Sequence, residues 1–203
     1  MPILDLGPAA REVARLLDGV DDKQLPEPTP CPGYPVAALL DHLMGLSMAF
    51  TWAARKASAA ASDSAESGPG MATAEHLDPD WRRLLPRRLD DLTAAWRDEA
   101  AWQGTTEAGG VVAMPADMMG AVALDELVLH GWDLARATGQ DFRCDPASTA
   151  AVLAFTSALA QPEAEAGRAG LFGPAVKVAE DGPTFDRALG FAGRDPAWAP
   201  PPA

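Results

Sequence analysis

The chain is poor in cysteine and in basic residues, and each scarcity excludes a class of protein. Its 203 residues include two cysteines, Cys31 and Cys144, which are too few for a disulfide scaffold and lack the CxxC spacing of zinc sites. We therefore expect a reducing, cytoplasmic environment. Sixteen basic residues stand against 29 acidic ones, which gives a formal net charge of -13. A chain this acidic repels phosphate backbones and anionic lipid surfaces, so we expect neither nucleic acid nor membrane as a partner.

Long apolar runs are missing as well. The longest one, Leu43 to Ala54, is interrupted by Ser47 and Thr51 and is far shorter than the roughly 20 residues of a membrane-spanning helix. The first five residues contain no basic region followed by an apolar stretch, so we expect no signal peptide. With 48% hydrophobic and 22% charged residues, the composition is typical of a soluble globular domain.

Alternating β-branched runs are nearly absent, whereas Ala and Leu recur at helical spacing, and this predicts an all-α fold. We expect four long helices at residues 5–18, 35–57, 80–102 and 115–138, a fifth helix at 145–161 and a short one at 183–192. Gly19 and Gly139 are expected to end the first and the fourth of these helices. Four long helices joined by long crossover loops are typical of a four-helix bundle with a short C-terminal extension.

We interpret residues 1–203 as a single domain with two irregular parts. Residues 58–79 are rich in Ser, Ala, Gly and Asp, and this composition predicts a long mobile loop. The loop is either a lid over a functional site or a passive surface loop. Residues 109–112 are compatible with a short extended piece, and residues 162–203 form an irregular C-terminal segment that includes the short helix.

Histidine is scarce too, with three in the whole chain. His42 lies in the predicted second helix, and Leu39 and Leu46 fall within about 60° of it in helical projection. A histidine in such an apolar stripe is either a core residue bonded to a backbone carbonyl or a ligand. His76 lies in a polar stretch, where we expect a solvated surface side chain.

The predicted fourth helix carries Glu126 and His130, which are spaced i, i+4 and share one face with Met119 and Ala123. A carboxylate in an apolar stripe is costly unless it is paired, hydrogen-bonded or bound to a metal. Two imidazoles and one carboxylate from neighbouring helices can hold a divalent metal and leave positions open for water, as catalytic sites do. The alternative is a buried Glu–His hydrogen bond with His42 uninvolved, and the spacing alone does not separate the two.

Three motifs occur in order along the chain: TPCPGY at 29–34, ELVLHGWDLARATG at 126–139 and GRDPAW at 193–198. Together they resemble actinobacterial proteins of the DinB-like superfamily that are related to the N-terminal domain of mycothiol-dependent maleylpyruvate isomerase. The resemblance runs from Leu4 to Trp198. It implies a DinB-like four-helix bundle with one divalent metal held by His42, Glu126 and His130, the three positions that the apolar stripes single out. At residues 34 and 35 this sequence has Tyr and Pro, where that family more often has Trp and a hydroxyl N-cap.

Asp133 is the candidate catalytic residue. It follows His130 by three positions and falls on the same side of the helix, where it can orient a metal ligand or a bound water. Capping of a turn or an ion pair with Arg136 is the alternative, and the sequence favours neither.

Four further residues have a structural interpretation, and three of them also have a chemical one. We expect Cys31 to be a small buried hydrophobe, with a reactive thiol at the start of a helix as the alternative. We expect Arg194 and Asp195 to form a structural salt bridge near the C-terminus, with contact to an anionic substrate as the alternative. Trp132 is expected in the core or in a pocket wall.

These residues support three functional hypotheses. The first is a metal-dependent enzyme of the transferase or isomerase type, which combines a small electrophile with a low-molecular-weight thiol. The family resemblance suggests mycothiol as the thiol, and zinc is the expected metal, with nickel, manganese or iron as alternatives. The second is a non-catalytic metal-binding or small-ligand-binding scaffold or regulator. The third is a non-haem Fe(II) oxygenase, which also uses two histidines and one carboxylate. We expect small-molecule partners and a monomer or homodimer.

Overall fold

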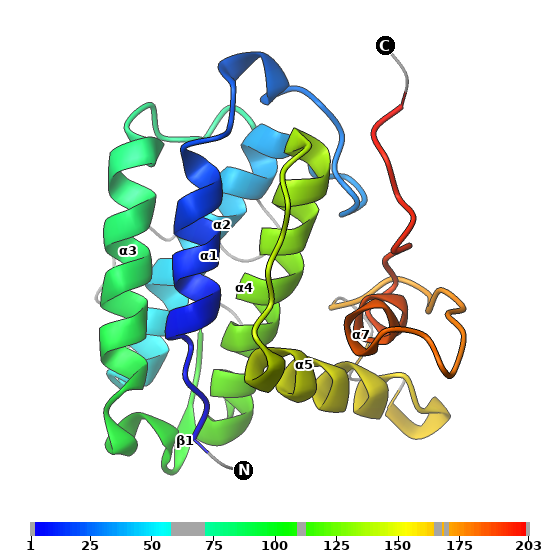
Figure 1. Ribbon diagram of the computed structural model, residues 1–203. Coiled ribbons are helices and arrows are strands. Elements are labelled where there is room, and N and C mark those ends of the chain that lie inside the picture. The colour runs from blue at the N-terminus through cyan, green and yellow to red at the C-terminus, as the bar shows by residue number, and fades with distance from the viewer. Residues whose placement is uncertain (1–2, 58–71, 109–112, 165–167, 169–170, 202–203) are drawn as a thin grey trace.

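Four helices lie side by side and enclose the core of the protein (Figure 1). They are α1 (Gly7–Leu17), α2 (Val36–Ala54), α3 (Trp81–Trp96) and α4 (Ala116–Thr138). Helices α1 and α2 each contact both α3 and α4, so the four helices close around one apolar interior. The computed structural model describes residues 3–57, 72–108, 113–164, 168 and 171–201.

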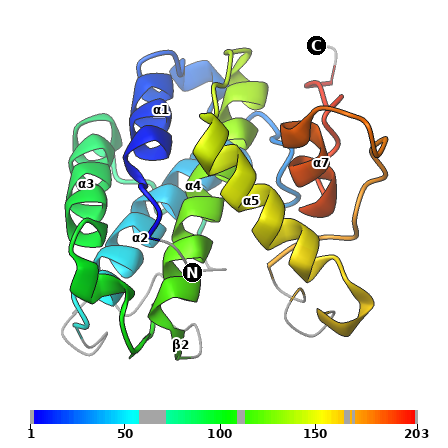
Figure 2. The ribbon, with the colours of Figure 1, turned by 60° about the horizontal axis from the view of Figure 1, so that its bottom comes forward.

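The remaining elements are short or lie outside the bundle. Figure 2 shows α5 running obliquely across α4, with α7 on its far side, and α5 contacts both of these helices. Strands β1 and β2 form a small antiparallel pair that precedes α4, with Thr106 opposite Met114. These elements are α5 (Pro146–Leu159), α7 (Thr184–Phe191), β1 (Thr105–Thr106) and β2 (Met114–Pro115), with 3-10 turns η1 (Asp22–Gln24), η3 (Glu99–Trp102) and η4 (Pro162–Ala164). The predicted all-α bundle with long crossovers is confirmed.

The two helix ends predicted at glycines differ in backbone conformation. Gly139 ends α4 in the left-handed conformation, with φ of 70°, as predicted. Helix α1 ends at Leu17, just before Gly19 as predicted, but its C-cap Asp18 is right-handed and Gly19 has no positive φ, so Gly19 does not form the left-handed cap. Gly19 instead leaves room for Gln140, since a Cβ there would lie 2.6 Å from the Gln140 Cδ. The Gln140 amide uses that room to donate to the carbonyl of Leu16 at 2.9 Å.

Two predicted helices are too long. Helix α3 ends at Trp96 rather than at residue 102, because Asp98 adopts an extended conformation and its side chain caps the next turn, η3. The turn brings Trp102 back against Trp96, with ring centroids 4.9 Å apart and the Trp102 indole N–H donating to the Trp96 carbonyl at 2.8 Å. Helix α2 ends at Ala54, and Lys56, with φ of 53°, leaves the helical conformation soon after.

Helix α2 is the most apolar part of the core. Within the described parts of the chain, it is the one helix long and apolar enough to span a membrane, and 72% of that window is buried inside the protein. Its apolar residues face α3 and α4, so the apolar character of α2 matches its place in the bundle interior.

Two of the predicted segments lie wholly or partly outside the described residues. Of the predicted mobile loop at 58–79, residues 58–71 lie outside them, and so does the short extended piece at 109–112. In the described part of the loop, the backbone N–H of Thr73 donates to the Asp41 carboxylate at 3.2 Å, next to His42. The single-domain organisation of residues 1–203 and the lid remain predictions.

We predict opposite stability changes at two helical glycines. A Cβ on Gly120 of α4 would lie 2.6 Å from Trp102 and 2.9 Å from Trp96, so Gly120→Ala should lower the free energy of unfolding by about 1–3 kcal/mol. A Cβ on Gly45 of α2 would have nothing within 4 Å, so Gly45→Ala should raise that free energy by about 0.5–1 kcal/mol. Urea denaturation measures both. Equal effects of the two substitutions would contradict the packing of the two tryptophans on Gly120.

Candidate metal centre

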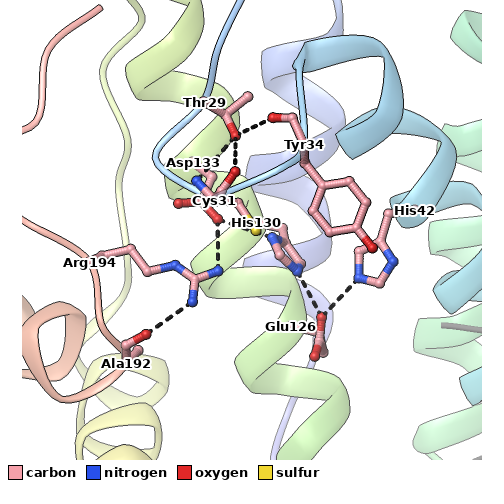
Figure 3. A network of polar contacts seen from close by, with 9 residues as sticks. All are labelled: Thr29, Cys31, Tyr34, His42, Glu126, His130, Asp133, Ala192 and Arg194. Atoms are coloured by element: carbon pink, nitrogen blue, oxygen red, sulfur yellow. Dashed lines mark hydrogen bonds and ion pairs between the residues drawn. The ribbon is translucent and has the colours of Figure 1, made fainter. Parts of the chain in front are cut away.

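The three predicted metal ligands lie together between α2 and α4 (Figure 3). Nε2 of His42 lies 3.3 Å from Oε2 of Glu126, and Nε2 of His130 lies 2.9 Å from the same oxygen. One ligand atom from each residue falls within 4.8 Å of the others, a spacing that a single ion can bridge. The interpretation of His42 as a core histidine bonded to a backbone carbonyl is wrong, since its Nε2 faces a carboxylate.

Only small fractions of the three side chains are exposed. Side-chain exposure is 10% for His42, 18% for Glu126 and 8% for His130. The rings of His42 and His130 meet edge to face at 4.8 Å, and the ring of Tyr34 stacks on His42 at 5.3 Å. The Tyr34 ring therefore covers one face of the His42 ring, while the Nε2 atoms of both histidines point at Glu126.

Hydrogen bonds within residues 29–34 hold the loop before α2 next to this site. The Thr29 hydroxyl donates to the carbonyl of Tyr34 at 2.7 Å and accepts the backbone N–H of Cys31 at 3.1 Å. Gly33, with φ of 84°, makes the turn that these bonds require. This turn places Tyr34 against His42 and buries Cys31.

Asp133 contacts the far side of the His130 ring. Its Oδ2 lies 3.0 Å from Nδ1 of His130 and 3.1 Å from a guanidinium nitrogen of Arg194. The predicted alternative, an ion pair between Asp133 and Arg136, is wrong, because the Arg136 guanidinium donates to the carbonyl of Trp198. A carboxylate behind a histidine in this way sets the tautomer and ring orientation of a metal ligand. The catalytic role of Asp133 remains a prediction.

His130 therefore lies between two carboxylates. Burial works against its charged form, but the hydrogen bonds to Asp133 and Glu126 outweigh burial and raise the pKa of His130 to about 9. Burial also works against the charged form of Glu126, but His130 and His42 hold its pKa well below the usual range. Both carboxylates are acceptors, so His130 either carries two ring protons or presents a bare Nε2 to a cation that Glu126 also binds. The donor set fits a divalent metal.

A second group of possible ligands, Cys31, His130 and Asp133, also lies within 4.8 Å. Arg194 already supplies a positive charge to Asp133, so this position disfavours a second cation. Burial and the charge of Asp133 raise the pKa of the Cys31 thiol to about 12, which keeps it protonated. Cys31 therefore behaves as the small buried hydrophobe expected from the sequence, and the group with His42 and Glu126 is the candidate metal centre.

The structure adds one residue that the sequence did not single out. Asp125, next to Glu126, is 1% exposed, and its Oδ1 has no hydrogen-bond partner among the described residues. Burial, followed by the charge of the neighbouring Glu126, raises the pKa of Asp125 well above its usual range. Its position beside an i, i+4 ligand pair was visible in the sequence, but its burial depends on the elements that pack on the outer face of α4.

Other residues lie where the sequence placed them. His76 is exposed in the loop before α3, Trp132 is 6% exposed in the core, and Arg194 forms the expected buried salt bridge. The partner of Arg194 is Asp133, and not a neighbour near the C-terminus. Asp195 instead accepts the backbone N–H of Ala197 at 2.9 Å and so shapes the turn that follows.

The chain is related to proteins of known sequence and structure. Residues 6–135 match the family of the mycothiol maleylpyruvate isomerase N-terminal domain, and this range is more than half of the chain. The protein belongs to that family. An uncharacterized protein of Mycobacterium tuberculosis, present in two strains, is 27% identical over 191 residues, which cover 89% of this chain and 91% of the relative.

Solved structures agree on the fold. The crystal structure of mycothiol-dependent maleylpyruvate isomerase and that of its histidine-to-alanine variant each superpose with a TM-score of 0.57 at 20% identity. Each match covers 77% of this chain and 70% of the isomerase. The DinB-like helical fold of the family is therefore confirmed for this chain. The family range ends in α4, so α5, α7 and Arg194 lie beyond it.

We predict that His130→Ala removes the metal without unfolding the helices. The substitution deletes a nitrogen that faces Glu126, so metal affinity should fall by more than roughly 100-fold. Elemental analysis of the purified protein and helical circular dichroism measure the two properties. His76→Ala is the matched control, because His76 is exposed and lies outside the ligand group. Equal metal content in the wild type and both variants would contradict the assignment.

We predict that Cys31 resists alkylation. Burial raises its pKa to about 12 and that of Cys144 to about 11, so both are thiols and not thiolates at neutral pH. Iodoacetamide at pH 7 should modify the folded protein much more slowly than the urea-unfolded protein, as followed by mass spectrometry. Cys144→Ala isolates the signal of Cys31. Fast modification of Cys31 in that folded variant would support the reactive-thiol alternative.

Proposed function

We propose that this protein is a divalent-metal-dependent enzyme that uses a low-molecular-weight thiol in the transfer or isomerisation of a small electrophilic substrate. The observation that carries the proposal is the convergence of two Nε2 atoms on one oxygen of Glu126, while Nδ1 of His130 is occupied by Asp133. Three protein ligands of this kind leave coordination positions for an exogenous donor, as catalytic sites do.

The protein side chains prepare the site in separate ways. His42, Glu126 and His130 would hold the ion, and Asp133 keeps the proton of His130 on Nδ1 so that Nε2 stays free for ligation. A bound divalent ion would supply a Lewis acid that stabilises an exogenous thiol as its thiolate. Zinc is our first choice of metal, with nickel, manganese or iron as alternatives.

The nucleophile would come from outside the protein. Cys31 is the one cysteine near the site, and its raised pKa keeps it in the unreactive thiol form. A small-molecule thiol fills this gap. Membership of a family named for mycothiol maleylpyruvate isomerase supports mycothiol as that thiol.

The other partners follow from charge and fold. Because the chain carries a net charge of -13, we propose that its partners are small molecules rather than nucleic acid or a membrane. We also propose that the protein works in the cytoplasm as a monomer or homodimer. A non-catalytic metal-binding scaffold is the second candidate function, because the same three ligands would hold a metal without any chemistry. Two histidines and one carboxylate also suit a non-haem Fe(II) oxygenase. Elemental analysis tests part of this choice: iron favours the oxygenase, no metal favours a small-ligand scaffold, and zinc or nickel fits both the thiol enzyme and the metal-binding scaffold, which thiol binding then distinguishes.

We predict that mycothiol binds through sulfur to the cobalt-substituted protein. Titration should produce a sulfur-to-cobalt charge-transfer band, because the three ligands leave room for the thiolate. Cys31→Ala should keep the band and most of any activity, whereas His130→Ala should lack the band. An unchanged spectrum at millimolar mycothiol would contradict thiol ligation and favour the scaffold.

A further inference from the structure

A turn at the end of α7 directs Arg194 back to α4. The backbone N–H of Gly193 donates to the carbonyl of Gly190 at 3.0 Å, and that of Arg194 donates to the carbonyl of Leu189 at 2.9 Å. This pair of bonds is a Schellman motif, which requires the left-handed φ of 79° at Gly193. The local backbone thus determines where the Arg194 side chain begins.

The guanidinium of Arg194 points at Asp133, which contacts His130 on the side away from Glu126 (Figure 3). Arg194 is 6% exposed and Asp133 is fully buried. One guanidinium nitrogen donates to Oδ2 of Asp133 at 3.1 Å, and another donates to the carbonyl of Ala192 at 3.0 Å. The same Asp133 oxygen accepts from Nδ1 of His130. Two hydrogen bonds and the width of one imidazole ring therefore separate Arg194 from the ligand atom of His130.

A second arginine holds the same segment without facing a carboxylate. Arg136, one turn after Asp133 on α4, donates to the backbone carbonyl of Trp198. Arg136 and Arg194 thus both fasten residues 193–198 to α4. Of these two arginines, Arg194 is the one that adds a positive charge beside a carboxylate in contact with a proposed metal ligand.

The charges at the site can be counted. Among the side chains that form the ion pairs of this site, Glu126 and Asp133 contribute two negative charges and Arg194 one positive charge. A divalent ion would bring the total to one positive charge, and without Arg194 the total would be zero. A buried site with one positive charge favours an anion at its open position, because binding the anion neutralises the site.

We propose that Arg194 sets the charge of the metal centre so that the open position selects a monoanionic ligand over a neutral one. This inference rests on the proposed function and extends it: the ligand class is a thiolate or another small monoanion. Arg194 acts through charge and through Asp133, and does not itself touch the ligand.

The test measures azide binding to the cobalt-substituted protein by visible absorption. Arg194→Gln should weaken azide binding by roughly 10-fold, because one nearby positive charge is lost. Asp133→Asn should strengthen it by a similar factor, because one negative charge is lost. The double variant should return to within about 3-fold of the wild-type affinity, because the total charge is restored.

Arg136→Gln is the matched control, since it removes an arginine that fastens the same segment but faces only a carbonyl. Its azide affinity should stay within about 2-fold of the wild-type value, a difference too small for a charge effect. Arg194→Lys keeps the charge and should bind azide as the wild type does. This variant replaces Arg194→Gln if the latter does not fold, and a loss of roughly 10-fold in Arg194→Lys would then count against the proposal.

Other outcomes overturn the inference. If Arg194→Gln binds azide as the wild type does, or if Asp133→Asn and Arg194→Gln both weaken azide binding, then Arg194 serves only to position Asp133. If the wild-type protein takes up no cobalt, the proposed metal centre itself fails, and cobalt content reports this separately from azide affinity.

Discussion

The His130 imidazole lies between two carboxylates inside a helical bundle, and the rest of the structure is arranged around that constraint. Glu126 accepts on one side of the ring and Asp133 on the other, all within three turns of α4. Charged groups are costly to bury without partners, so each carboxylate needs a cation or donor close by. His42 from α2 meets the first carboxylate, and Arg194 from the C-terminal segment meets the second.

Helix α4 can hold the polar side chains Glu126, His130 and Asp133 because its other faces are apolar and are packed against neighbouring helices. The bundle packs α1 and α2 against it, and α5 crosses its outer side. Gly120 allows Trp96 and Trp102 to approach its first turns closely, and the Gly139 turn releases the chain toward α5. A rigid, well-packed helix holds ligand atoms in place more accurately than a loop does, which suits a metal centre.

The relatives share the bundle, and the function depends on the site within it. At 20% identity and a TM-score of 0.57, the likeness to mycothiol-dependent maleylpyruvate isomerase concerns the fold. The family match ends at residue 135, just after Asp133, whereas the partner of Asp133 lies at residue 194. The C-terminal segment of this chain therefore completes a polar chain that begins in the family domain.

Features that depend on local geometry could be predicted from the sequence. Helical periodicity placed Glu126 and His130 on one face, and Gly139 marked the end of α4, because both properties involve residues within a few positions of one another. Contacts outside the helical period were not predicted: Gly19 leaves room for Gln140, and α3 ends at Trp96, where Trp102 folds back on it.

The groups that meet across the bundle are set by how the helices pack, and the sequence does not predict them. His42 and Glu126 are 84 residues apart, and Asp133 and Arg194 are 61 apart, so their pairing depends on how α2, α4 and the C-terminal segment pack. No period in the sequence encodes those distances, since they result from the burial of apolar faces shared by several helices. The sequence named His42, Glu126 and His130 as candidate metal ligands, and the packing of the helices brings them together and places Arg194 next to Asp133.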